Sequence, residues 1–192
     1  MVFGRDGSGC EKAAGERLTF NPTFLSLERA VRDGALVRRW PVRARREDST
    51  RAIFVLPELK VILDGVTSGP FPGVEWEVLI RSYGVGALLT ISFRKNRHKP
   101  DIERLGDYDE VWAMCARKPK PGWRLLGRFV QPDCFVGLAA WPKGALFERY
   151  DEAAADVIRR WRHIFGSQEP WRGNRPADYL TGALHDVDER DG

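Results

Sequence analysis

Alternating hydrophobic and polar positions predict a β-hairpin near the middle of the chain. Residues 74–81 alternate Val, Trp, Val and Ile with Glu and Arg, so one face of a strand would be buried and the other solvated. Residues 87–94 show the same period of two, and glycines 84 and 86 supply the turn between the two strands. The run 52–63 is also rich in β-forming residues, and Pro57 restricts it to a sheet edge or a break.

A second hairpin is predicted over residues 110–118 and 123–130. The turn between its strands contains Pro119, Pro121 and Gly122, which pre-set or permit turn dihedral angles. Residues 134–141 are apolar throughout, as is typical of a central strand buried on both faces. Because consecutive strands usually pair, we expect these three strands to lie side by side and antiparallel. Before them, Asp101 is expected to cap a brief turn of helix that ends near Gly106.

A period of 3.6 predicts helices near the two ends. Asn21 and Pro22 resemble an N-cap and a first helical position, so a short helix is expected as far as residue 32. Between Phe147 and Phe165 the hydrophobic residues fall on one helical face and the arginines on the other, and Gly166 is a natural end. Such a helix must bury its apolar face, and the preceding sheet offers the nearest apolar surface.

These elements predict an α+β fold: an antiparallel sheet of about five or six strands, a long C-terminal amphipathic helix packed on it and a short N-terminal helix. The 192 residues favour one compact domain, which we expect over residues 17–185. Residues 1–16 are rich in glycine and charge, which is typical of a flexible tail. Residues 186–192 are expected to fray.

Composition narrows the possible functions only slightly. The net charge of +4 permits a polyanionic partner without requiring one. No run approaches about 18 consecutive apolar residues, and glycine and charge interrupt the first residues, so we expect a cytoplasmic protein with no membrane partner. The three cysteines, at positions 10, 115 and 134, show no metal-ligand spacing and are expected to be reduced, buried thiols.

Motifs for catalysis or metal binding are not evident. Histidines 98, 163 and 185 lie far apart in the sequence, so we predict no metal site and no cofactor. Acidic pairs at 107–110 and 186–189 have the chemistry to hold a divalent ion, but such pairs in loops and tails are usually solubilising.

Basic residues on the second hairpin form the remaining candidate site. Cationic side chains beside an aromatic ring are the combination that binds phosphates and unstacked bases. The candidate nucleic-acid-binding residues are Arg117, Lys118, Lys120, Trp123, Arg124, Arg128 and Lys143. The simpler interpretation is that arginines on the outer face of a sheet only keep it in solution. The binding hypothesis requires the cations to converge on one surface without each being tied to a local carboxylate.

Residues 105–146 resemble the C-terminal sheet of RelE/ParE-type toxins. The resemblance is carried by Glu110 and Val111 at the start of one strand, by the pair Trp123 and Arg124, and by the apolar run 135–141 followed by Lys143. It implies a ribosome-associated RNase fold in which Arg124, Arg128 and Lys143 neutralise phosphate charge in the cleavage transition state.

Two functional hypotheses follow, and a third possibility, a small-molecule enzyme with a pocket between helix and sheet, has no assembled acid–base pair in the sequence. The first is a protein that binds a polyanion, namely RNA, with RNA or the ribosome as its partner, with or without the endoribonuclease activity of a RelE-like toxin. The alternative is a protein-interaction or immunity-like accessory module, in which Trp112 or Trp171 contributes to a partner surface. The sequence alone leaves open whether the protein is an enzyme.

Overall fold

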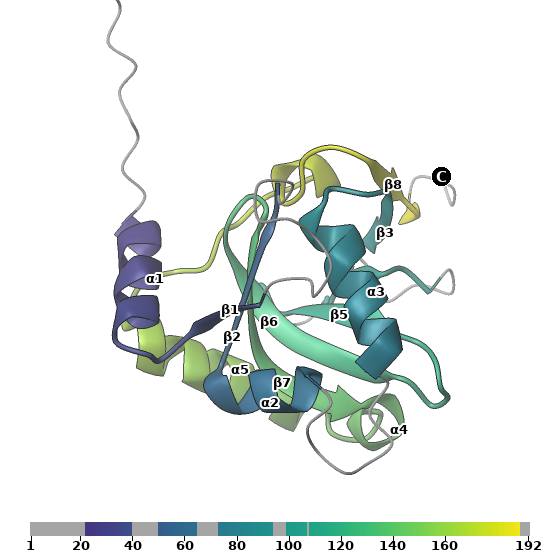
Figure 1. Cartoon of the computed structure of the whole chain (residues 1–192), viewed down its shortest axis with the longest axis horizontal. Helices are drawn as coiled ribbons and strands as arrows, with labels where there is room; N and C mark the ends of the chain where they lie inside the picture. Colours follow the sequence, from purple (N-terminus) through teal and green to yellow (C-terminus); the bar gives the residue numbers. More distant parts are fainter. Residues whose placement is uncertain (1–21, 40–49, 65–72, 94–98, 107, 189–192) are drawn as a thin grey trace, which may run out of the picture.

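A single mixed β-sheet of eight strands forms the centre of the protein (Figure 1). This computed structural model describes residues 22–39, 50–64, 73–93, 99–106 and 108–188. The strands are β1 (Val37–Arg39), β2 (Ala52–Val55), β3 (Leu89–Ser92), β4 (Ile102–Arg104), β5 (Trp112–Ala116), β6 (Trp123–Gln131), β7 (Cys134–Pro142) and β8 (Leu184–Asp186). Their order across the sheet is β1-β2-β7-β6-β5-β4-β3-β8. The pairs β2–β7, β3–β4 and β3–β8 are parallel, and the others are antiparallel.

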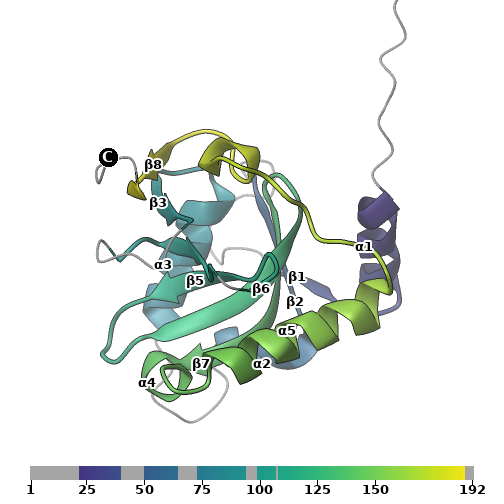
Figure 2. The ribbon, with the colours of Figure 1, turned by 180° about the vertical axis from the view of Figure 1, so that it is seen from behind.

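Helices cover both faces of this sheet. They are α1 (Pro22–Arg32), α2 (Pro57–Leu63), α3 (Gly73–Gly84), α4 (Lys143–Leu146) and α5 (Tyr150–Phe165), with a short 3-10 turn at Pro176–Asp178. Helix α3 lies in front of the sheet in Figure 1, whereas α5 crosses the opposite face of β6 and β7 in Figure 2. Helix α1 packs against α5 and β6.

The expectation of an antiparallel sheet of five or six strands with a long C-terminal helix is wrong. The sheet has eight strands and three parallel pairs, and several of its strands are only three residues long, too short to leave a period in the sequence. Helix α5 has 16 residues and is followed by the 3-10 turn and by β8. The C-terminal segment therefore extends the sheet instead of ending in a helix.

The predicted strand over residues 74–81 is the helix α3. Its buried residues Trp76, Ile80 and Tyr83 are spaced by four and three, as a helix requires, while Val74 and Val78 are exposed. The same letters satisfied a period of two because apolar residues occupy every even position from 74 to 80. The first predicted hairpin is therefore absent, and its second half, β3, pairs in parallel with β4 and β8.

Of two shorter predictions, the break at Pro57 is confirmed and the turn of helix after Asp101 is wrong, each for a local reason. The run 52–63 is a strand only as far as Val55, because Pro57 opens helix α2, where its missing N–H costs nothing. The turn of helix expected after Asp101 is strand β4, which pairs with β5. Here the hydrogen bonds of the neighbouring strand outweigh the capping preference of a single aspartate.

Other predictions are confirmed. Helix α1 spans the expected residues, and β5, β6 and β7 lie side by side and antiparallel. Gly166 follows α5 with a φ of +64°. The expected tail at residues 1–16 lies outside the described residues. Of the stretch expected to fray, Asp186 belongs to β8, and Asp188 accepts hydrogen bonds from the Ser92 hydroxyl and from the Phe93 N–H.

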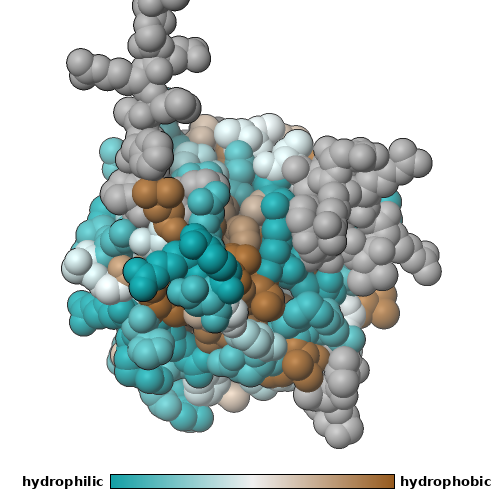
Figure 3. All heavy atoms as spheres, turned by 60° about the vertical axis from the view of Figure 1, so that its left-hand side comes forward, coloured by the Kyte–Doolittle hydropathy of each residue, from teal (hydrophilic) through white to brown (hydrophobic). Residues whose placement is uncertain are grey.

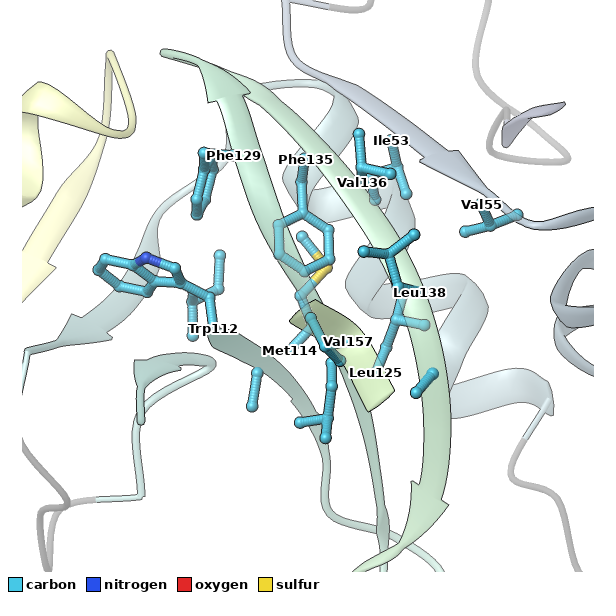
Figure 4. Packing of buried hydrophobic residues seen from close by; sticks show 14 of the residues in the cluster. Ile53, Val55, Trp112, Met114, Leu125, Phe129, Phe135, Val136, Leu138 and Val157 are labelled. Atoms are coloured by element: carbon cyan, nitrogen blue, oxygen red, sulfur yellow. The ribbon is translucent and has the colours of Figure 1, made fainter. Parts of the chain in front are cut away.

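Aromatic side chains connect the central strands of the core. Trp112, Phe129 and Phe135 follow one another across β5, β6 and β7 (Figure 4), with ring centroids 5.5 and 5.2 Å apart. On the outer surface in Figure 3, apolar side chains form separate patches among hydrophilic ones. Within the described ranges, no helix is long and apolar enough to cross a lipid bilayer.

Candidate nucleic-acid interface

The turn between β5 and β6 lies beside α4 (Figures 1 and 2). A basic hollow of about 550 Å³ opens there. The side chains around it come from this turn, from the start of β6, from α4 and from the residue two positions before Asp101. They are Lys99, Arg117, Lys120, Pro121, Arg124, Lys143, Gly144 and Phe147. Five of these eight residues carry a positive charge, so the hollow is a local concentration of cations on a protein whose net charge is only +4.

Four of the seven residues proposed from the sequence line this basic hollow. They are Arg117, Lys120, Arg124 and Lys143. Lys118 is exposed on the same turn but is not part of the lining. Trp123 is half-buried and, by the alternation along β6, lies on the opposite face from Arg124. Arg128 lies deeper under α5, as described below.

Backbone hydrogen bonds hold the β5–β6 turn against α4. The Gly122 N–H donates to the Pro119 carbonyl at 2.9 Å, which closes the turn, and the Lys143 N–H donates to the Gly122 carbonyl at 2.8 Å. Gly122 has a φ of +82°, and a Cβ there would lie 2.6 Å from the Ala116 carbonyl oxygen. Only glycine fits this position. The turn that carries Lys120 is thereby fixed beside the residue that carries Lys143.

Arg117 is tied to the loop before β4. Its guanidinium donates to the Asp101 carboxylate at 3.1 Å and to the Pro100 carbonyl. The same carboxylate accepts from the Thr90 N–H and hydroxyl, at 3.0 and 2.8 Å, so strand β3 holds Asp101 in place for its contact with Arg117. This arrangement fixes Arg117 at the edge of the hollow and uses part of its charge locally.

Arg124 is also paired. Its side chain is 8% exposed, and its Nε lies 3.5 Å from the Glu103 carboxylate on β4, while its Nη1 donates to the Trp123 carbonyl. Behind it, burial raises the pKa of the Cys115 thiol, and burial together with the Glu103 charge raises the pKa of Tyr150. A thiol held in its neutral form is a poor nucleophile. Because Arg124 is buried and lines the hollow, it forms the inner wall.

The three lysines differ from the two arginines. In the described part of the chain, no carboxylate forms an ion pair with Lys99, Lys120 or Lys143. Lys120 and Lys143 are exposed to solvent. The binding hypothesis requires cations that are not tied to a local carboxylate. The lysines meet this requirement, whereas Arg117 is paired with Asp101 and Arg124 with Glu103.

Phe147 adds an aromatic ring to the same lining. It is 72% exposed, although the preceding residue, Leu146, is fully buried. The hydrophobic pattern placed Phe147 on the apolar face of the long helix, but α5 begins only at Tyr150. Neither Phe147 nor Lys99 was among the residues proposed from the sequence. The basic run 95–100 was the available signal for Lys99, whereas no sequence signal distinguishes an exposed phenylalanine from a buried one.

Arg128 is part of the core and not of the hollow. It is 2% exposed, donates to the Asp109 carboxylate and backbone carbonyl, and stacks 5.7 Å from the Trp161 ring centroid of α5. Burial lowers the pKa of its guanidinium, and the charge of Asp109 opposes this effect. Arg124 and Arg128 share one face of β6 and both are buried, but Arg128 lies under Trp161 of α5, whereas Arg124 lies where that face borders the hollow.

The tryptophans proposed as a partner surface are not exposed. Trp112 is fully buried, and its Nε1–H donates to the Glu110 carboxylate. Trp171 is half-buried and donates to the Asp178 carbonyl at 2.8 Å. Both rings serve to attach the C-terminal segment and the strand ends to the core.

Comparison of the chain with models of protein families, with curated proteins and with solved structures found no significant match.

Proposed function

We propose that this protein binds RNA through the basic hollow. The observation that carries the proposal is that three lysines with no carboxylate partner among the described residues, Lys99, Lys120 and Lys143, line one concavity together with Arg117 and Arg124. Phosphate groups supply most of the affinity of nucleic acids for proteins, and lysine and arginine are the side chains that neutralise them.

The size and charge of the hollow suit a nucleotide unit. Its volume of about 550 Å³ falls in the range of small-ligand sites, which is roughly 300–1,000 Å³. Two carboxylates, Asp101 and Glu103, offset two of the five positive charges, and the lysines retain the rest. A hollow with surplus positive charge and an open mouth attracts a polyanion from a distance, because the field of its cations adds up.

The arginines have a supporting role in this proposal. Because Arg117 and Arg124 are fixed by carboxylates, their remaining N–H groups are oriented before a ligand arrives. The lysines are flexible, and they are the groups whose positive charge a bound phosphate would neutralise. Binding should therefore depend chiefly on the lysines.

The test is the salt dependence of binding to a fluorescent single-stranded RNA. For single strands, each neutralised phosphate contributes roughly 0.7 to the slope of log affinity against log salt. The double variant Lys120→Ala/Lys143→Ala should lower the steepness of that plot by about 1.4, which is two such contributions. A control with the same loss of charge, Arg29→Ala/Arg159→Ala, changes two exposed arginines on α1 and α5 and should leave the slope unchanged. Binding that is insensitive to salt, or equally affected in both double variants, would remove the proposal.

The same samples test the endoribonuclease activity that the toxin resemblance implies. Of the three residues to which the resemblance gives a role, Arg124 and Lys143 line the hollow. Incubation with end-labelled RNA, followed on a denaturing gel, should then give fragments that are lost in Lys143→Ala. Intact RNA at saturating protein would limit the function to binding.

The protein-interaction hypothesis keeps one specific observation in its favour. Helix α3 exposes Val74 and Val78, 82% and 58%, beside a second hollow of about 750 Å³ between α2, α3 and β1. Its lining includes four cations, Arg38, Arg39, Lys60 and Arg81, but only two carboxylates, Asp64 and Glu77. An apolar wall with surplus positive charge fits an acidic, partly apolar segment of a partner protein. If such a partner exists, Val78→Glu should abolish its co-purification and leave RNA binding intact.

A further inference from the structure

We infer that the ligand of the basic hollow is single-stranded, and that Phe147 is the surface on which one unpaired base stacks. This inference rests on the proposed function, because it assigns the form of nucleic acid that the same hollow accepts. It starts from the position of the Phe147 ring, which lines the hollow and is 72% exposed.

The local backbone explains why the ring faces solvent. Phe147 is the C-cap residue of α4 and keeps helical dihedral angles, φ −55° and ψ −38°. In a helical turn, neighbouring side chains point about 100° apart, so the burial of Leu146 directs the next residue away from the core. An exposed phenylalanine on its own is common. Here, however, it stands on the rim of the strongest described concentration of unpaired lysines.

The space beside the ring is suited to a flat ligand. Gly144, one turn of helix earlier, contributes no side chain, and its nearest neighbours across the hollow are atoms of the Pro121 ring, 3.8 and 3.9 Å from an added Cβ. The apolar groups Phe147 and Pro121 therefore belong to the same lining as Lys120 and Lys143. A nucleotide can place its base against the apolar part and its phosphates near the ammonium groups.

Duplex RNA cannot make this contact. In a duplex each base already stacks on its neighbours and is paired, so only a base that has left the stack can cover an aromatic side chain. The phosphates of a duplex still reach the lysines, which provides binding without stacking. The geometry therefore predicts that single strands bind more tightly than duplexes. One base–ring contact sets the magnitude of this difference in affinity.

The expected effect follows from measured base–aromatic contacts. Replacing such an aromatic residue with alanine weakens single-strand binding by about 5-fold to 150-fold. Phe147→Ala should show a loss in this range for a single-stranded RNA and less than about 2-fold for a blunt-ended, fully paired duplex of the same composition. Phe147→Trp should retain the affinity of the wild-type chain, and RNA should quench its fluorescence by more than it quenches that of the wild-type chain, which already has seven tryptophans.

Three controls keep the two proposals separate. Leu88→Ala, at another exposed apolar residue, 64% exposed, should not affect binding. An oligonucleotide with abasic positions should bind the wild-type chain as weakly as the intact oligonucleotide binds Phe147→Ala. Lys120→Ala/Lys143→Ala should weaken both single-stranded and duplex RNA.

The outcomes are distinguishable. If the lysine variant loses affinity but Phe147→Ala binds both RNA forms as the wild type does, the stacking inference is wrong and RNA binding stands. If the wild-type chain binds neither form at low salt, both proposals are wrong. A loss confined to single strands in Phe147→Ala supports both.

Discussion

The turn that carries Lys120 depends on one glycine, and Gly122→Ala should destabilise the protein more than an ordinary glycine replacement. Gly122 has a φ of +82°, and an added Cβ would lie 2.6 Å from the Ala116 carbonyl oxygen and 3.1 Å from the Arg117 Cα. The contacted atoms are backbone atoms of the facing strand, which cannot turn away as a side chain can. The Gly122 carbonyl also accepts the hydrogen bond from the Lys143 N–H.

Two costs add in this variant. A left-handed conformation costs a residue with a Cβ about 1–2 kcal/mol. Forcing an extra carbon into a packed site costs a further 1–3 kcal/mol, roughly, because neighbouring backbone must shift. The sum is about 2–5 kcal/mol, a large part of the roughly 5–15 kcal/mol that stabilises a typical domain.

Gly34→Ala is the matched control. Gly34 has a φ of +76°, but no atom lies within 4 Å of an added Cβ, so only the conformational cost applies. Urea unfolding followed by circular dichroism gives the free energy of unfolding for both variants. The difference between them isolates the contact with Ala116 and Arg117. Equal free energies of unfolding would refute the close approach of the turn to β5, and with it the position of Lys120 beside Lys143.

Two further predictions concern buried groups. Arg128→Met should lower the free energy of unfolding by about 1–3 kcal/mol, because a charged hydrogen bond to Asp109 is lost while Asp109 keeps its contact with Arg172. RNA affinity should stay within about 2-fold of the wild-type value, since Arg128 does not line the hollow. A loss of RNA binding at unchanged stability would contradict the placement of Arg128 in the core. Burial raises the pKa of the Cys134 thiol to about 12, above the value of roughly 8.5 in an unfolded chain. The stabilisation linked to this neutral thiol is therefore complete below about pH 8.5 and is lost as the pH rises toward 12, so the free energy of unfolding should fall by about 1 kcal/mol between pH 7 and 9.5. Cys134→Ala should lack this part of the fall, and parallel pH curves for the two proteins would show that the thiol is accessible in the folded state.

The part of the fold that the sequence predicts is the part with long, unambiguous periods. Residues 110–141 form the three neighbouring strands expected of them, because long apolar runs and a turn with two prolines and a glycine leave few alternatives. The segment 74–81 fails because its apolar residues fit both periods, and tertiary burial of Trp76, Ile80 and Tyr83 decides for the helix. Strands β1, β4 and β8 have three residues each and are defined by their partners.

The candidate site likewise has residues whose placement the sequence predicts and residues whose placement it does not. The turn and the first residue of α4 are close in the sequence to the strands that flank them, so the convergence of Lys120 and Lys143 follows from the predicted antiparallel order of β5, β6 and β7. Lys99 comes from a segment whose course depends on the pairing of β4, which the sequence does not specify. Phe147 belongs to the apolar period of the following helix and is exposed because α5 starts three residues later.

Which cations can bind a ligand is decided by the neighbours of each strand and not by charge. Arg124 and Arg128 are four residues apart on one face of β6, so the sequence alone does not distinguish which of them can bind a ligand. Arg128 is enclosed beneath Trp161 of α5, whereas Arg124, although its side chain is only 8% exposed, lies at the end of this face that borders the hollow. At that end the carboxylates of Asp101 and Glu103 fix the two arginines, which leaves the lysines as the groups whose charge a phosphate can use. The arrangement explains why a protein of low net charge can still carry a strongly basic site. Asp101 and Glu103 orient the two arginines around the site, and the remaining positive charge is concentrated in the three flexible lysine side chains on its rim.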